Sequence, residues 1–253
     1  MKPKIFFDSR WIGNHGIGRI AKELRMRMKV QDLDVCGRPT SPLDMIFLLI
    51  SILRNTKKND LIFSPGFNFP IFFIRKYIFF VCDLNHIDIP ENSNFLKKFY
   101  YNFFLKRAIL NAAHIFTISE FSRKRIIDWS GVDKLKVSCV GCGVETRFFE
   151  DPVDVDTKYA FKYALCVGNR KAHKNQKRVI ESFCNSKSYP DLKLVFSGTE
   201  SNELIKSIKK YDHLNKIVFA GNLTDEELIN IYKKASMLIF PSIYEGFGLP
   251  IVE

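Results

Sequence analysis

The stretch MLIFPSIYEGFGLPIVE, residues 237–253, has the pattern of a buried strand that leads through a loop into a helix. The apolar run Met237–Phe240 predicts the strand, and Pro250 stands where proline favours the first turn of a helix. Gly246 and Gly248 let backbone amides approach a ligand closely, and the start of the helix offers free N–H groups to a phosphate. Such a junction is typical of α/β folds that bind ligands at the carboxyl ends of their strands.

Short apolar runs alternate with amphipathic stretches along the rest of the chain, which predicts βα units around parallel sheets. Strands are expected at 4–8, 60–63, 77–82, 114–118, 135–140, 162–167, 192–197, 215–220 and 236–240. Helices are expected at 17–29, 43–54, 94–111, 120–130, 175–187, 201–210 and 224–235. Ser119 is a natural N-cap for the fourth of these helices, and Gly131 is a natural end.

A change in composition indicates two domains. Residues 151–158 are acidic, contain Pro152 and lack a hydrophobic period, which is typical of a linker. We therefore expect two Rossmann-like, doubly wound α/β domains, residues 1–150 and 159–253, that face each other across a cleft.

Positive charge is concentrated in the first of these domains. Residues 1–150 carry 24 Lys and Arg against 14 Asp and Glu, whereas residues 151–253 carry 15 against 13. Such a surface favours contact with an anionic membrane or a phosphorylated substrate, and the alternative is a merely soluble basic face. No recognisable nucleic-acid module accompanies the charge, so no nucleic-acid partner is expected.

The apolar runs are too short to cross a bilayer, which takes about 20 residues. Peripheral attachment stays open through the Phe-rich stretch Phe67–Val81, although a buried strand or helix is the favoured interpretation. Six scattered cysteines, with Cys139 and Cys142 interpreted as ordinary thiols, predict a reducing compartment. We expect a cytoplasmic protein, with peripheral contact at the inner face of the plasma membrane left open.

Two segments carry side chains suited to a phosphorylated sugar. Glu245 and Glu253 can each accept hydrogen bonds from neighbouring hydroxyls, which suits a sugar and a ribose. The segment VGNRKAHKNQKR, residues 167–178, places Arg170 and Lys174 after a predicted strand, where they would neutralise a departing diphosphate. Taken alone, this second segment would be interpreted as a solvated basic face.

A third segment, HGIGRIA at residues 15–21, has the spacing GxGxxA of a dinucleotide fingerprint. In that fingerprint the first glycine follows its strand closely, whereas residues 9–15 intervene here. The alternative to an NAD(P)-dependent oxidoreductase is a glycine-rich loop, with Gly16, Gly18 and Arg19, that lies over another ligand.

Six segments in a fixed order carry a resemblance to a known family: GIGRI, CDLNHIDIPENS, FTISEFSRKRI, VGCGVETRFF, VGNRKAHKN and FPSIYEGFGLPIVE. Together they resemble the retaining glycosyltransferases of family 4, which have the GT-B fold. The resemblance implies transfer of a hexose, such as mannose, from a nucleoside diphosphate sugar with retention of the anomeric configuration. The implied acceptor is a glycan or a polyprenyl-linked glycan in polysaccharide or lipopolysaccharide biosynthesis.

The resemblance also implies roles for individual residues. Glu245 would bind hydroxyls of the donor sugar, Glu253 the ribose, and Lys174 with Arg170 the diphosphate. Further donor contacts are expected at Gly168, Gly246, Phe247, Gly248 and Leu249, and cleft loops at Gly16, Gly18, Arg19, Cys82 and Asp83. No metal ion and no cofactor besides the donor is expected, because lysine and a helix start supply the positive charge.

Two features depart from the family pattern. Relatives often carry His-Asp where this chain has Cys82 and Asp83, and a thiol is a poorer hydrogen-bond donor. Family members also continue past the second glutamate with further βα units, whereas this sequence ends at Glu253. The second domain is therefore expected to be incomplete, and an inactive truncated fragment is the alternative to an active enzyme.

Overall fold

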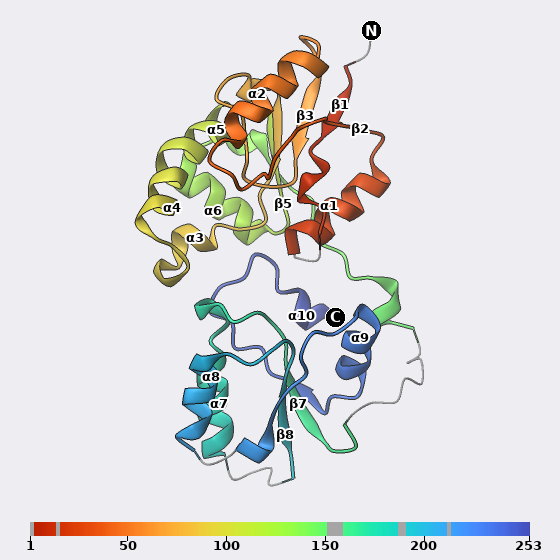
Figure 1. Ribbon diagram of the computed structural model, residues 1–253, viewed down its shortest axis with the longest axis vertical. Coiled ribbons are helices and arrows are strands. Elements are labelled where there is room, and N and C mark those ends of the chain that lie inside the picture. Colours follow the sequence, from red (N-terminus) through yellow and green to blue (C-terminus); the bar gives the residue numbers. More distant parts are fainter. Residues whose placement is uncertain (1–2, 14–15, 151–158, 187–190, 212–213) are drawn as a thin grey trace. The chain divides into compact units, whose positions relative to one another are not determined.

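Each half of the chain forms its own parallel β-sheet with helices packed against it (Figure 1). The computed structural model describes residues 3–13, 16–150, 159–186, 191–211 and 214–253. The chain divides into two units between Cys142 and Gly143, so residues 143–150 group with the second unit. The predicted linker at 151–158 lies outside the described residues.

The sheet of the first unit has six parallel strands in the order β2-β1-β3-β4-β5-β6. Apart from the polar, exposed edge strand at Gln31–Asp32, its strands are largely apolar, as expected for a sheet that is covered on both faces. Phe7 lies opposite Phe63, and both rings are buried and stacked with their centroids 5.4 Å apart. The strands are β1 (Ile5–Phe7), β2 (Gln31–Asp32), β3 (Leu61–Ser64), β4 (Tyr77–Phe80), β5 (His114–Thr117) and β6 (Val137–Cys139).

Helices cover both faces of this sheet because neighbouring strand residues point to opposite sides. Phe6 packs in the cluster that holds α2, α5 and α6, whereas Phe7 packs in the cluster that holds α1. Ser119 Oγ accepts the amide of Ser122, and Gly131 ends α6 at a φ of 75°, so the predicted cap and end are confirmed. The helices are α1 (Gly16–Arg27), α2 (Asp44–Asn55), α3 (Asn85–Asp88), α4 (Phe95–Phe99), a π-helical turn (Tyr100–Leu105), α5 (Lys106–Asn111) and α6 (Glu120–Ser130).

The second unit repeats this plan with four parallel strands in the order β10-β7-β8-β9. Helices α7 and α8 pack on one face, and α9 packs on the other (Figure 1). The strands are β7 (Tyr163–Cys166), β8 (Lys193–Phe196), β9 (Ile217–Phe219) and β10 (Met237–Leu238). The helices are α7 (Gln176–Asn185), α8 (Asn202–Lys209), α9 (Asp225–Lys233) and α10 (Leu249–Val252).

The strand orders locate one switch point in each sheet, where the connections leave a strand in opposite directions. In the first sheet β2 lies on one side of β1 and β3 on the other. In the second sheet β8 and β9 extend to one side of β7, and β10 returns to the other side. Ligands of doubly wound sheets bind beyond the carboxyl ends of the strands at such points, so the loops after β1, β3, β7 and β10 are the places for a site.

A buried polar network occupies the carboxyl ends of β1 and β3. Asp8 and Asp44 are 0% and 2% exposed, and Arg10 lies between them, with nitrogen–oxygen distances of 2.8 Å to Asp8 and 2.6 Å to Asp44. Asn68 Nδ2 donates to both carboxylates, at 2.8 and 3.0 Å, and its Oδ1 accepts from the indole of Trp11 at 2.6 Å. The network ties the start of α2 to the segment that leads into α1, and no sequence pattern predicted it.

Removing the cation of this network should destabilise the first unit. We expect Arg10→Met to lower the free energy of unfolding by about 3 kcal/mol, because two buried carboxylates would lose their counter-charge. Both tryptophans, Trp11 and Trp129, lie in the first unit, so tryptophan fluorescence in urea follows this unit alone.

The matched control is Arg25→Met, which breaks a solvent-exposed pair with Asp32. We expect the free energy of unfolding to change far less there, because solvent screens an exposed ion pair. Equal midpoints for the two variants would show that the buried network contributes no more than a surface ion pair.

Candidate functional site

The loops after β7 and β10 meet at the switch point of the second sheet and bring two predicted site residues together. Lys174 Nζ lies 2.6 Å from Glu245 Oε1, and the two side chains are 13% and 21% exposed. A lysine and a glutamate that are 71 positions apart in the chain thus share one partly buried position at the carboxyl edge. The structure places them together, as expected for residues that handle the same ligand.

Backbone contacts hold the two loops in register. The amide of Ile243 donates to the carbonyl of His173 at 2.9 Å, and Asn175 Nδ2 donates to the carbonyl of Pro241 at 3.2 Å. Asn175 adopts a left-handed conformation, with a φ of 51°, directly before α7, and asparagine tolerates this conformation better than most residues. The loops that carry Lys174 and Glu245 are therefore joined by hydrogen bonds from residues next to each of them.

Gly168, which follows β7, makes room for the lysine. Its φ of 144° strains any other residue, and a Cβ built there would lie 3.3 Å from Cδ of Lys174. The amide of Gly168 donates to Ser197 Oγ at 3.1 Å, which links this loop to the end of β8. A side chain at position 168 would crowd the stem of Lys174, so the predicted glycine site has a physical reason.

Arg170 does not present a free guanidinium to a ligand. Its nitrogens donate to the carbonyls of Gly168, Ser197 and Thr199 and to Gln176 Oε1, at distances between 2.7 and 3.2 Å. The guanidinium also stacks over the rings of Phe196 and Phe219, and burial lowers the pKa of Arg170. Four of its five donors are thus used within the protein. The geometry fits a residue that fixes the loops after β7 and β8.

The glycine-rich turn before α10 follows directly from Glu245. Gly246 and Gly248 are buried, and Gly248 adopts a φ of 91°, which glycine accommodates without strain. Phe247 is exposed between them, and Leu249 begins α10. The predicted junction of strand, loop and helix is confirmed in this part of the chain.

Glu253 has a partner that the sequence analysis missed. Its Oε2 accepts the hydroxyl of Tyr232, which lies on α9, at 2.8 Å. Burial first, and then the neighbouring Glu253 carboxylate, raise the pKa of Tyr232 far above its usual range, so the phenol stays protonated and donates. The amphipathic pattern of 224–235 predicted only the helix, and no sequence signal points Tyr232 at this carboxylate.

The remaining predicted site residues lie in the first unit. Gly16 and Gly18 were predicted to shape a loop, but they belong to the first turn of α1, and this prediction is wrong. Gly18 is needed there because an added Cβ would lie 2.3 Å from the carbonyl oxygen of Gly13. Arg19 is exposed on the same helix. Eight residues separate the end of β1 from α1, which is not the close spacing of a dinucleotide fingerprint.

Cys82 and Asp83 follow β4 at the carboxyl edge of the first sheet. Asp83 Oδ1 accepts the amide of Asn85 at 2.9 Å and so supports the start of α3. The carbonyl of Cys82 accepts the hydroxyl of Ser122 at 2.8 Å. Burial raises the pKa of the Cys82 thiol, which keeps it neutral. In the described residues no group of three His, Cys, Asp or Glu side chains is arranged to hold a metal ion.

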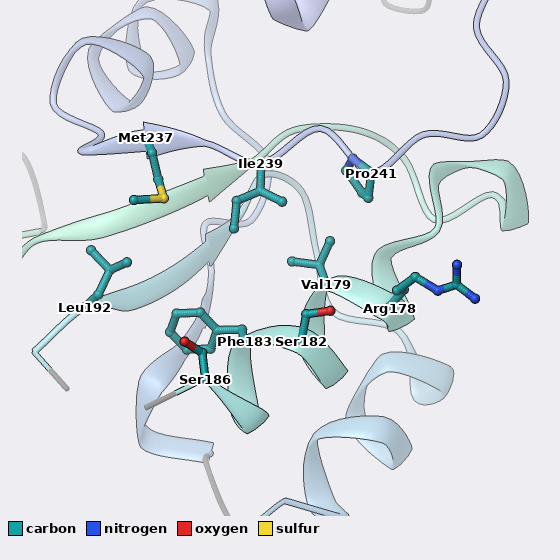
Figure 2. Close-up of a pocket in the computed structure, with 9 residues that line it drawn as sticks. All are labelled: Arg178, Val179, Ser182, Phe183, Ser186, Leu192, Met237, Ile239 and Pro241. Atoms are coloured by element: carbon teal, nitrogen blue, oxygen red, sulfur yellow. The ribbon is translucent and has the colours of Figure 1, made fainter. Parts of the chain in front are cut away.

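A second feature of the second unit is an apolar pocket of about 320 Å³ between α7 and β10 (Figure 2). Among the lining residues that the structure describes, Arg178 is the only charged one. None of the predicted site residues lines it, and it offers little that could bind a diphosphate. The other lining residues are Val179, Ser182, Phe183, Ser186, Leu192, Met237, Ile239 and Pro241.

Several known proteins are similar to this chain in sequence. Residues 150–253 match the family described as Glycosyl transferases group 1. The O-antigen chain mannosyltransferase RfbU of Salmonella typhimurium is 28% identical over 212 residues, which are 82% of this chain and 56% of that protein. The O-antigen chain mannosyltransferase B of Escherichia coli is 28% identical over 161 residues, which are 59% of this chain and 42% of that protein. The chain thus spans little more than half the length of the first of these relatives.

Solved structures share the fold at low sequence identity. Anabaena Alr3699/HepE, in complex with UDP and glucose, is similar with a TM-score of 0.67 at 14% identity, over 99% of this chain and 77% of that one. A glycosyltransferase from Rickettsia africae is similar with a TM-score of 0.58 at 14% identity, over 100% of this chain and 76% of that one. Residues 150–253 therefore carry a Glycosyl transferases group 1 domain, and the chain shares the α/β architecture of GT-B glycosyltransferases.

Proposed function

We propose that this protein transfers a hexosyl group from a nucleoside diphosphate sugar to a glycan or lipid-linked acceptor, with retention of the anomeric configuration. The observation that carries the proposal is the Lys174–Glu245 pair at the switch point of the second sheet. A cation beside a carboxylate at this edge suits a ligand that has a diphosphate next to a sugar. An exchange of hydride with a nicotinamide would give neither residue a role.

The transferred sugar is proposed to be mannose. Two relatives are named as O-antigen chain mannosyltransferases and a third as a serotype-specific mannosyltransferase, which supports a mannosyl donor and an acceptor in the synthesis of a surface polysaccharide. The solved relative from Anabaena contains UDP and glucose, so a uridine nucleotide is the alternative to test beside GDP-mannose.

In the proposed reaction, the main task of the protein is to stabilise the negative charge of the departing diphosphate. As the bond from the sugar to the diphosphate breaks and a bond to the acceptor hydroxyl forms, negative charge grows on the departing phosphate. Lys174 would stabilise that charge while Glu245 holds hydroxyls of the sugar. Glu253, oriented by Tyr232, would hold the ribose. The backbone amides of Phe247, Gly248 and Leu249 would approach the donor.

We propose that the reaction needs neither a metal ion nor a further cofactor. Lys174 is a fixed cation in the place where a divalent ion would otherwise neutralise the diphosphate. Arg170 is assigned a different role from the one expected from the sequence: it positions the loop of Lys174 and is not itself a diphosphate ligand.

The acceptor side is proposed to work at a membrane in the cytoplasm. Residues 1–150 carry 24 Lys and Arg against 14 Asp and Glu, an excess that favours an anionic bilayer surface and an acceptor held there. In the described part of the chain no helix has the length and apolar character that a bilayer crossing requires. Contact with the membrane is therefore proposed to be peripheral.

Glutamine substitutions at the two members of the pair should separate binding from turnover. We expect Lys174→Gln to weaken the binding of the nucleoside diphosphate by roughly 10- to 100-fold, because a charge-assisted hydrogen bond to phosphate is lost. Glu245→Gln should bind the nucleoside diphosphate as tightly as the parent or more tightly, since it frees the ammonium of Lys174. Its rate of transfer should nevertheless fall on the order of 100-fold. Calorimetry gives the affinities, and release of GDP or UDP gives the rates.

Lys177→Gln is the matched control, because Lys177 lies on α7 and makes a pair of the same 2.6 Å length with Glu203 on the exposed surface. It should leave both affinity and rate unchanged. Binding that survives Lys174→Gln unaltered would contradict the proposed diphosphate site, and so would an equal loss in the Lys177 variant.

A charge-conserving change at Arg170 should distinguish a positioning residue from a ligand. We expect Arg170→Lys to destabilise the second unit by about 2 kcal/mol, because lysine has three donors for the four acceptors that Arg170 serves and has no planar group to stack on the rings. Far-UV circular dichroism follows the unfolding of both units, whereas tryptophan fluorescence follows the first unit alone. The transition that only circular dichroism detects therefore measures the stability of the second unit. A variant of unchanged stability with a lost affinity for the nucleoside diphosphate would instead make Arg170 a direct ligand.

A further inference from the structure

A helical segment of the first unit exposes an unusual number of large apolar side chains. Five residues of α4 and the π-helical turn form what we call the aromatic stripe, and they are between 44% and 82% exposed. The transfer of these side chains from water into an apolar environment would be favourable, so their exposure in water is unfavourable. The members of the stripe are Phe95, Leu96, Phe99, Phe103 and Phe104.

The stripe is continuous along one side of the helix. Phe95, Phe99 and Phe103 follow one another at intervals of four, which places them on the same side. The rings of Phe99 and Phe103 are 4.7 Å apart between centroids, and Phe104 meets Phe99 edge-on at 5.9 Å. Figure 1 shows α4 at the outer left edge of the first unit.

The opposite side of the same segment is already fully used by the core. Tyr101, Leu105 and Ile109 are buried against the first sheet. The hydroxyl of Tyr100 donates to the carbonyl of Phe67 at 2.9 Å, which fixes the helix to the loop before β4. The stripe therefore cannot turn inward, and its exposure is a property of the folded unit.

Positive charge accompanies the stripe, and negative charge does not. Lys97 and Lys98 are exposed within it, and Arg107 is exposed one turn after it. The sequence has no Asp or Glu between Glu91 and Glu120. An apolar stripe with cations and no anions complements a surface that is apolar inside and anionic at its boundary.

The interpretation of Phe67–Val81 as either core or membrane contact also receives an answer from the structure. Its second part is the buried strand β4, as the sequence favoured, whereas Ile71, Phe72 and Phe73 are exposed. The turn that follows them, Ile74–Lys76, packs against α5. A second group of exposed apolar residues thus precedes a turn that contacts the same helical segment.

We propose that the aromatic stripe is the surface by which this protein docks on an anionic lipid bilayer. The aromatic rings enter the boundary between headgroups and acyl chains, while Lys97, Lys98 and Arg107 contact lipid phosphates. This assignment rests on the peripheral membrane contact proposed above and adds the residues that make it. A protein partner with a neutral apolar face would leave the cations without a role.

The experiment measures co-sedimentation of the full chain with vesicles of phosphatidylglycerol and phosphatidylcholine, and with vesicles of phosphatidylcholine alone. The parent protein should bind the anionic vesicles and bind the neutral ones far more weakly. We expect the double variant Phe95→Ser, Phe103→Ser to bind the anionic vesicles at least about tenfold more weakly. Lys97→Gln with Lys98→Gln should also bind about tenfold more weakly.

The matched control is Leu43→Ser with Leu53→Ser, two exposed leucines at the ends of α2. All three double variants alter exposed side chains, so their urea midpoints should equal that of the parent. A local reporter is available, because the indole of Trp129 donates to Asn102 of the π-helical turn. The tryptophan emission should shift to the blue with anionic vesicles in the parent and in the leucine control, but not in the phenylalanine variant.

The outcomes separate this inference from the proposals on which it stands. A parent protein that ignores anionic vesicles overturns the membrane contact itself and leaves the donor site untouched. If the parent and the phenylalanine variant bind anionic vesicles equally well, the assignment of the aromatic stripe is overturned, and the membrane contact itself is not. Self-association that the phenylalanine variant abolishes, without any vesicle binding, assigns the stripe to a second copy and also overturns the proposal.

Discussion

Parallel strands place all their carboxyl ends at one edge of a sheet, and the site of this protein depends on that constraint. In the second unit the return of β10 to the side of β7 opposite β8 brings two distant loops together at that edge. Lys174 and Glu245 meet there at 2.6 Å, and two hydrogen bonds hold their loops together: the Ile243 amide donates to the carbonyl of His173, and the Asn175 side chain donates to the carbonyl of Pro241. The ion pair is the consequence of the topology.

The pair also gives the resting site an electrostatic logic. A partly buried lysine without a counter-charge is costly, and Glu245 removes that cost while no ligand is bound. A bound donor would exchange both contacts. The diphosphate would replace Glu245 as the anion beside Lys174, and sugar hydroxyls would replace the lysine as the hydrogen-bond donors to Glu245. Gly168 and Arg170 support the position of Lys174. Gly168 leaves space for the aliphatic part of the lysine, and Arg170 joins the loops after β7 and β8 by hydrogen bonds.

Much of the fold could be predicted from the sequence because its signals are local. Apolar runs such as Leu61–Ser64 and the capped helix Glu120–Ser130 show their structure in a few residues. The strand β2 could not be predicted, because Gln31 and Asp32 are polar and exposed, and the π-helical turn at Tyr100–Leu105 looked like ordinary helix. Lys174 and Glu245 were predicted separately from their motifs.

Local sequence patterns could not predict the side-chain contacts between residues that are distant in the chain. The network of Asp8, Arg10, Asp44 and Asn68 joins positions up to 60 apart in the chain. It buries the carboxylates of Asp8 and Asp44, although charged residues are usually exposed. Arg170 was predicted to be a free cation because sequence shows its charge and hides the carbonyls around it. Tyr232 was missed for the same reason, since only the folded unit brings it to Glu253.

The most direct test of the account is a crystal structure of the protein with a bound nucleoside diphosphate. We predict that an oxygen of the terminal phosphate lies within hydrogen-bond distance of Lys174 Nζ, and that the Lys174–Glu245 contact lengthens to admit it. A nucleotide whose phosphates lie elsewhere, in the apolar pocket beside α7 or at the carboxyl edge of the first sheet, would contradict it.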